Sequence, residues 1–198
     1  MNTLATTILA HTEKLPEGAP ICAKELLHLG GRAAVDQALS RLVKRGHLLR
    51  VGRGVYVRPV EGRFGARPPS TSQVVEAFAG LKGETVVPHG AAAANRLGLT
   101  SQVPIRAVYL TSGPSRRLTV GSQTIELRHA PRWQFVLAGR RSGEVLHALA
   151  WLGPERVGEA LAVLKRKLPR SEWEEIASVR SILPTWLAEE VSEIIVNG

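Results

Sequence analysis

The sequence has 198 residues, 44% of them hydrophobic, and a formal net charge of +9 at pH 7. Its length allows one large or two small domains with their own cores, and no apolar run approaches the ~20 residues of a membrane span. The N-terminus lacks the positive start and apolar stretch of a signal peptide, and a single cysteine, Cys22, excludes an internal disulfide. We therefore expect a cytoplasmic protein.

The positive charge is concentrated in two blocks. Residues 32–67 hold nine Lys and Arg against Asp36 and Glu61, and residues 106–141 hold seven arginines against Glu126. Concentrated positive charge favours polyanionic partners, although arginines used as ordinary solvated surface would explain the second block equally well. We expect the second block to form a secondary basic surface made of Arg106, Arg116, Arg117, Arg128, Arg132, Arg140 and Arg141.

The chain is expected to begin with three short elements. Apolar residues recur at helical spacing over residues 3–14, Ile21 suits a one- or two-residue strand, and residues 23–29 predict a second helix. Gly30 and Gly31 follow that helix directly, as in the tight turn of a helix-turn-helix motif.

The next stretch predicts an amphipathic helix followed by a β-hairpin. It covers residues 31–59 and has the sequence GRAAVDQALSRLVKRGHLLRVGRGVYVRP. One helical face is apolar and suited to packing on a core, and its residues are Val35, Ala38, Leu39 and Leu42. Gly46 is the expected left-handed helix stop. Beyond it, apolar residues alternate on both sides of Gly52-Arg53-Gly54, which is typical of a hairpin with glycines at its turn.

A basic helix that leads directly into a basic hairpin is typical of a winged helix-turn-helix. In that motif the helix enters the major groove of DNA, and the wing contacts phosphates or the minor groove. The alternative is an ordinary surface helix and hairpin whose charges are merely solvated. We expect double-stranded DNA to be contacted by Arg32, Gln37, Ser40, Arg41, Lys44, Arg45, Arg50, Arg53 and Arg58.

Residues 61–71 (EGRFGARPPST) are rich in Gly, Pro and Arg and have no periodicity. This composition predicts a linker, from which Arg63 and Arg67 could still reach phosphates. The expected organisation is therefore a winged helix-turn-helix domain at 1–60, a linker at 61–71 and a mixed domain at 72–198.

The second domain is expected to begin with alternating helices and strands and to end in helices. Ser171 and Glu174 have the spacing of a capping box. Helices are predicted at 72–81, 89–97, 144–152, 154–167, from Ser171 onward and at 185–196, and strands at 84–87, 105–111, 118–120, 124–128 and 133–137. The alanines of the 89–97 helix predict a close approach to another element of the same core. The expected fold class is α+β.

The sequence offers little support for an enzyme. Phosphoryl transfer needs clustered carboxylates to hold Mg²⁺, and the only aspartate is Asp36 on the predicted DNA-facing helix. The six histidines have no metal-ligand spacing, and no phosphate-binding glycine motif occurs. His89, in a Pro-His-Gly turn, is more consistent with helix capping or a buried structural role than with catalysis. We expect no cofactor, no metal and no catalytic residue.

The order of these segments resembles AbiEi-type antitoxins of abortive-infection, type IV toxin–antitoxin systems. The likeness is strongest at residues 31–58 and 86–120, which include VVPHGAAAANRLGLTSQVP and VYLTSGPSRRLTVG. It implies a DNA-binding repressor of its own operon, whose C-terminal domain opposes a cognate AbiEii-type nucleotidyltransferase toxin, directly or indirectly, in phage defence. It also implies an operator with inverted repeats. The alternative is a stand-alone winged-helix regulator whose C-terminal domain binds a small effector.

Overall fold

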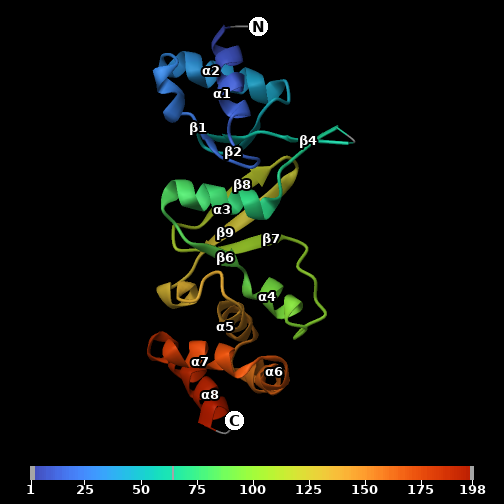
Figure 1. The fold of residues 1–198 in the computed structure, drawn as a ribbon, viewed down its shortest axis with the longest axis vertical. Helices are drawn as coiled ribbons and strands as arrows, with labels where there is room; N and C mark the ends of the chain where they lie inside the picture. The colour runs from blue at the N-terminus through green and yellow to red at the C-terminus, as the bar shows by residue number, and fades with distance from the viewer. Residues whose placement is uncertain (1–2, 64, 197–198) are drawn as a thin grey trace. The chain divides into compact units, whose positions relative to one another are not determined.

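The computed structural model describes residues 3–63 and 65–196, apart from the side chains of residues 3, 195 and 196, and the fold is mixed α+β (Figure 1). It divides into two compact units. Unit 1 comprises Met1–Glu84 and Arg116–Leu127, and unit 2 comprises Thr85–Ser115 and Arg128–Gly198. Among the described residues, no helix has both the length and the apolar character to cross a membrane.

Unit 1 begins with a small helical layer packed on a three-stranded sheet. Its elements are α1 (Thr3–Glu13), β1 (Ile21–Cys22), the 3-10 helix η1 (Glu25–His28), α2 (Arg32–Lys44), β2 (Leu49–Gly52) and β3 (Val55–Val57). The strands are antiparallel in the order β1-β3-β2, with Ile21 opposite Tyr56 and Leu49 opposite Val57. The expected short helix at 23–29 is thus only a 3-10 turn.

The predicted apolar face of α2 is confirmed. Val35, Ala38, Leu39 and Leu42 are all buried and pack in one cluster with α1 residues such as Ile8. Gly46, which follows the helix, has φ 77°, so the predicted left-handed stop is also confirmed.

The β2–β3 hairpin is covered on both of its faces. Tyr56 points into the cluster beneath α1 and α2, and Val55 and Val57, on the opposite face by strand alternation, are buried as well. A Cβ added at Gly52 would lie 3.6 Å from Leu118 and 3.8 Å from Phe78. Phe78 belongs to α3 (Thr71–Lys82) and Leu118 to β8 (Arg116–Val120), both in unit 1. Strand β8 forms an antiparallel hairpin with β9 (Gln123–His129).

The compact units therefore differ from the domains expected from the sequence. Residues 71–84 and 116–127 group with the N-terminal elements, and the division falls inside β9. The expected linker at 61–71 is also partly ordered. It contains an antiparallel hairpin of β4 (Val60–Gly62) and β5 (Gly65–Arg67), followed by a capping box at Ser70 and Gln73 that begins α3. The absence of periodicity did not mean an absence of strands, because each strand has only three residues, too few to show an alternating pattern.

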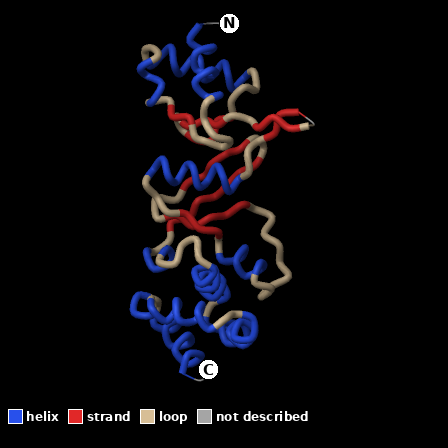
Figure 2. The backbone as a smooth tube through the Cα atoms, viewed as in Figure 1, coloured by secondary structure: helices blue, strands red, loops and turns tan. Residues whose placement is uncertain are grey.

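Unit 2 combines a two-stranded pair with a helical core. The antiparallel strands are β6 (Val86–Pro88) and β7 (Ala107–Thr111), and between them lies α4 (Gly90–Arg96). After the 3-10 helix η2 (Arg132–Phe135), every element is helical (Figure 2). These elements are α5 (Arg141–Leu152), α6 (Pro154–Lys167), α7 (Arg170–Ser178), the 3-10 helix η3 (Arg180–Ile182) and α8 (Thr185–Val196).

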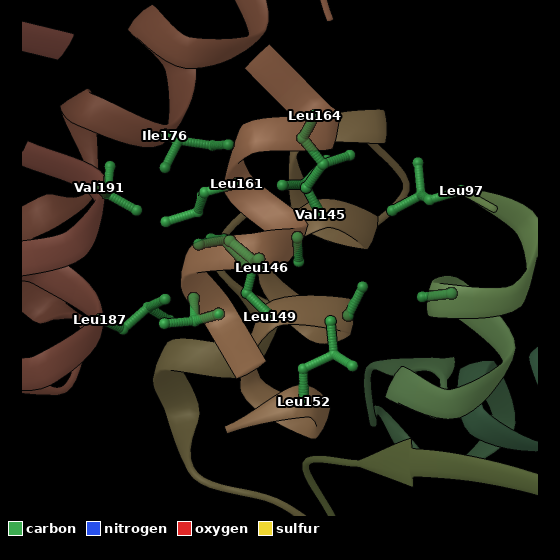
Figure 3. Close-up of a cluster of buried hydrophobic side chains, with 14 of the residues drawn as sticks. Leu97, Val145, Leu146, Leu149, Leu152, Leu161, Leu164, Ile176, Leu187 and Val191 are labelled. Atoms are coloured by element: carbon green, nitrogen blue, oxygen red, sulfur yellow. The ribbon is translucent and has the colours of Figure 1, made fainter. Parts of the chain in front are cut away.

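Helix α5 forms the centre of the core of unit 2 (Figure 3). Val145, Leu146 and Leu149 from α5 contact side chains of α6, α7 and α8, among them Leu161, Ile176 and Leu187. The face of small residues on α4 packs against α5, as expected from the alanines in its sequence. A Cβ at Gly90 would overlap the carbonyl oxygen of His147, so only glycine fits at this contact.

Two local predictions for unit 2 are wrong. The expected strand at 133–137 is a 3-10 turn, because the Gln134 amide donates to the Pro131 carbonyl at 3.0 Å. The expected capping box at Ser171 is absent, because α7 begins at Arg170 directly after Pro169. Pro169 therefore occupies the N-cap position in an extended conformation, and no side chain caps the helix.

Candidate nucleic-acid interface

The polar face of α2 carries several exposed polar and basic side chains. At about 100° per residue, Gln37, Ser40, Arg41 and Lys44 lie opposite the buried face of the helix, and all four are exposed. Arg45 follows the last turn and is exposed as well. Lys44 and Arg41 also lie where the dipole of the helix favours cations.

Arg32, at the start of α2, differs from the other residues of the predicted set. Its Nε donates to Asp36 Oδ2 at 2.8 Å, and this bond raises the pKa of Arg32 above its ordinary value. An exposed pair of this kind contributes little to stability, but it leaves the guanidinium partly neutralised. Arg32 lies on the flank of the polar face and is the weaker candidate for DNA contact.

The β2–β3 hairpin presents two of its three predicted arginines to solvent. Arg53 is exposed at the turn, next to Gly54, whose φ of 70° is favourable only for glycine. Arg50 is exposed on β2, and its Nε lies 3.5 Å from the Gly52 carbonyl. Arg58 is different, because it is half-buried and donates to the Thr12 carbonyl at 3.4 Å near the end of α1. Its role is thus at least partly structural.

The seven arginines of the expected secondary basic surface are divided between the two units. Arg116 and Arg117 belong to unit 1, and the other five belong to unit 2. Arg116 is half-buried, pairs with Glu84 and lies 5.3 Å from the Phe78 ring centroid. Arg117 approaches Glu126 at 3.5 Å, and Arg140 approaches Glu175 at 2.9 Å. At least three of the seven charges are therefore compensated locally.

Two histidines, His89 and His147, have structural roles. His89 is the N-cap of α4, where its Nδ1 accepts from the Ala91 amide at 3.3 Å, so the predicted capping role is confirmed. His147 on α5 is buried and hydrogen-bonds the Gln134 carbonyl. Burial lowers the pKa of both histidines, because it disfavours the charged form. Within the described residues, no cluster of His, Cys, Asp or Glu could hold a metal ion.

Sequence reasoning missed one concave site, a cavity in unit 2. It is lined by Thr85, Ser112, His129, Arg132, Phe135 and Val136. Only Arg132 had been singled out, as part of a basic block. The others come from separate segments with no shared motif, so their proximity depends on the tertiary fold.

Comparison with known proteins places the chain in a family without assigning an activity. A family model described as "Family of unknown function (DUF6088)" matches residues 7–175. No curated protein matches. Among solved structures, the chain is similar to the RV2827C protein from Mycobacterium tuberculosis, with 15% sequence identity and a TM-score of 0.44 over 99% of this chain and 82% of that one.

Proposed function

We propose that this protein, which belongs to the DUF6088 family of unknown function, is a double-stranded DNA-binding transcriptional regulator. The observation that carries the proposal is the polar face of α2, where Gln37, Ser40, Arg41 and Lys44 are exposed opposite a fully buried apolar face. A rigid helix with such a face fits the major groove of B-DNA.

The order of the elements in unit 1 supports the same reading. Helix, short strand, 3-10 turn, helix and hairpin follow one another, and the three strands form one antiparallel sheet. This order supports the proposal of a winged helix-turn-helix, in which α2 would be the recognition helix and the β2–β3 hairpin the wing. Arg53 at the hairpin turn is then suited to a phosphate contact, which adds affinity without base preference.

The residue types on α2 favour base recognition as well as charge attraction. Arginine makes bidentate hydrogen bonds to guanine, and glutamine makes them to adenine. Arg41 and Gln37 lie one turn apart on the exposed face, so both side chains can reach neighbouring base pairs. Lys44 and Arg45, near the end of the helix, are better suited to phosphates.

The proposal is tested by binding of the full chain to a duplex taken from directly upstream of its gene. The double variant Gln37→Ala/Arg41→Ala should bind that duplex roughly 30-fold more weakly or worse, since each bidentate base contact contributes about 1–3 kcal/mol. The matched control is Arg170→Ala, which removes the same charge from an exposed arginine of unit 2. Equal affinities of the double variant, the control and the parent protein would overturn the proposal.

We further propose that the regulated operon is a toxin–antitoxin operon. The support is the resemblance to AbiEi-type antitoxins, strongest at residues 31–58 and 86–120, and these ranges contribute elements to both compact units. In this role the protein represses its own operon and counteracts a nucleotidyltransferase toxin of the AbiEii type. Co-expression with the product of the adjacent reading frame tests the second activity. The Gln37→Ala/Arg41→Ala variant should still rescue growth if antitoxicity is separate from repression, and failure of the parent protein to rescue would contradict the antitoxin role.

A further inference from the structure

Unit 2 contains a cavity of about 530 Å³ beside the β6–β7 pair. It is bounded by Thr85, which precedes β6, by Ser112 after β7, by His129 at the end of β9, and by Arg132, Phe135 and Val136. This volume lies within the range of ordinary small-molecule sites, about 300–1,000 Å³. The DNA-binding proposal makes no use of the cavity.

Arg132 supplies a positive charge to the cavity. Its side chain is exposed, and it forms no salt bridge among the described residues. Other arginines of unit 2 differ in this respect, since Arg96 pairs with Glu144 and Arg140 pairs with Glu175. A guanidinium is always charged and matches the geometry of a carboxylate or phosphoryl group with two parallel hydrogen bonds.

Two more lining residues have hydrogen-bonding capacity to spare. Ser112 Oγ accepts from the Thr85 amide at 2.9 Å, which leaves its hydroxyl proton for another acceptor. His129 Nδ1 lies 2.9 Å from the Gly113 carbonyl, so Nδ1 carries a proton and Nε2 is left for a different partner. The His129 amide donates to Ser115 Oγ at 2.8 Å, which holds this segment against the 112–115 loop.

The remaining lining residues are apolar and held by the core. Phe135 packs against the cluster of Val87, Leu110 and Ala130, and Val136 packs against the main helical core of unit 2. Both are half-buried. Because their positions depend on packing, this apolar wall is present before any ligand binds, which reduces the entropic cost of binding.

We propose that this cavity binds a small organic anion. One carboxylate or phosphoryl group is held by Arg132, with Ser112 as a further donor, and the apolar body of the ligand lies against Phe135 and Val136. The site consists only of residues of unit 2, so it does not depend on DNA binding by α2.

The proposal is tested by titrating the full chain at constant ionic strength with benzoate, phenyl phosphate, inorganic phosphate and the uncharged benzamide. Amide resonances of Ser112, Arg132 and Val136 should shift on addition of benzoate or phenyl phosphate. Benzamide should bind at least about tenfold more weakly, because it cannot pair with the guanidinium. Arg132→Gln should weaken binding of the anions by a similar factor, and Arg106→Gln, the matched control at an exposed arginine outside the cavity, should not.

The outcomes separate the parts of the proposal. Tighter binding of benzoate supports a carboxylate ligand, and tighter binding of phenyl phosphate supports a phosphoryl ligand. Inorganic phosphate that binds as tightly as phenyl phosphate would overturn the role of the apolar wall. The whole proposal is overturned if neither organic anion binds below about 10 mM, or if Arg132→Gln leaves their affinity unchanged.

Discussion

Helices α2 and α5 have nearly the same length but opposite surroundings. In α2 (13 residues) one face is buried and the other is fully exposed. In α5 (12 residues) the buried residues lie on all sides, and they include Ser142, Gly143 and His147. A helix that is covered all round serves as a scaffold, whereas one with an open polar face can meet a partner. Substitutions in α5 should therefore change stability, and substitutions on the exposed face of α2 should change binding.

The largest expected effect is on the stability of unit 2, through helix α5. Replacement of Gly143 by Ala would place a methyl group on the Leu137 carbonyl oxygen, so unit 2 should lose about 3 kcal/mol of unfolding free energy or more. All four tryptophans lie in unit 2, so tryptophan fluorescence in urea reports this unit specifically. The matched control is Gly158→Ala on the exposed face of α6, where nothing lies within 4 Å and stability should rise by up to about 1 kcal/mol. Equal stabilities of the two variants would contradict the close contact at Gly143.

The second effect is on the open face of α2. Arg41→Ala should weaken binding to the upstream duplex by about 1–3 kcal/mol and relax the base preference at one position. Its urea midpoint, followed by circular dichroism because unit 1 holds no tryptophan, should stay that of the parent, since Arg41 is exposed and contributes little to folding. A loss of stability as large as the loss of affinity would remove the distinction between the two helices.

The third effect is a pH dependence of the stability of unit 2. Burial lowers the pKa of His147; the hydrogen bond to the Gln134 carbonyl and the Glu144 charge oppose this shift, and Arg96 adds to it. As pH falls below about 6.5, the unfolded chain gains a proton that the folded chain excludes, so unit 2 should lose stability until the folded pKa is reached. The slope from this group is at most about 1.4 kcal/mol per pH unit. His147→Gln should reduce the slope, and His89, whose pKa burial also lowers, contributes to what remains. An unchanged slope would contradict the lowered pKa of His147.

The fourth effect compares two adjacent arginines of unit 1. Arg116 is half-buried between Glu84 and the Phe78 ring, so Arg116→Ala should cost about 1 kcal/mol of stability. Arg117 is 76% exposed, and its loose pair with Glu126 should contribute less than about 0.5 kcal/mol. Amide hydrogen exchange in α3 measures both, because it reports on unit 1 directly. Equal protection in the two variants would contradict the structural role of Arg116.

The smallest effect concerns the salt dependence of DNA binding. Arg53→Gln should reduce the slope of log affinity against log salt by about 0.9, since one phosphate contact is lost. Arg140→Gln should leave the slope unchanged, because that guanidinium is already paired with Glu175. A change in the slope for Arg140 but not for Arg53 would reverse the assignment of the two basic regions.

The features that were predicted correctly from the sequence depend on neighbours within a few residues. The buried face of α2, the positive φ of Gly46 and the capping role of His89 each follow from helical period or end geometry. The α+β class and the close approach of α4 to α5 follow from similar local patterns. The same reasoning identified the exposed residues of α2, because a helix residue opposite the buried apolar face points to solvent.

What depended on residues far apart in the chain was decided only by the tertiary structure. Arg58 contacts Thr12, Arg116 pairs with Glu84 and Arg140 pairs with Glu175, and no local pattern relates these partners. A count of charges along the sequence therefore could not distinguish a solvated arginine from a compensated one. The grouping of β8 with unit 1 and the cavity at Arg132 were hidden for the same reason, because both assemble segments that only the packed core brings together.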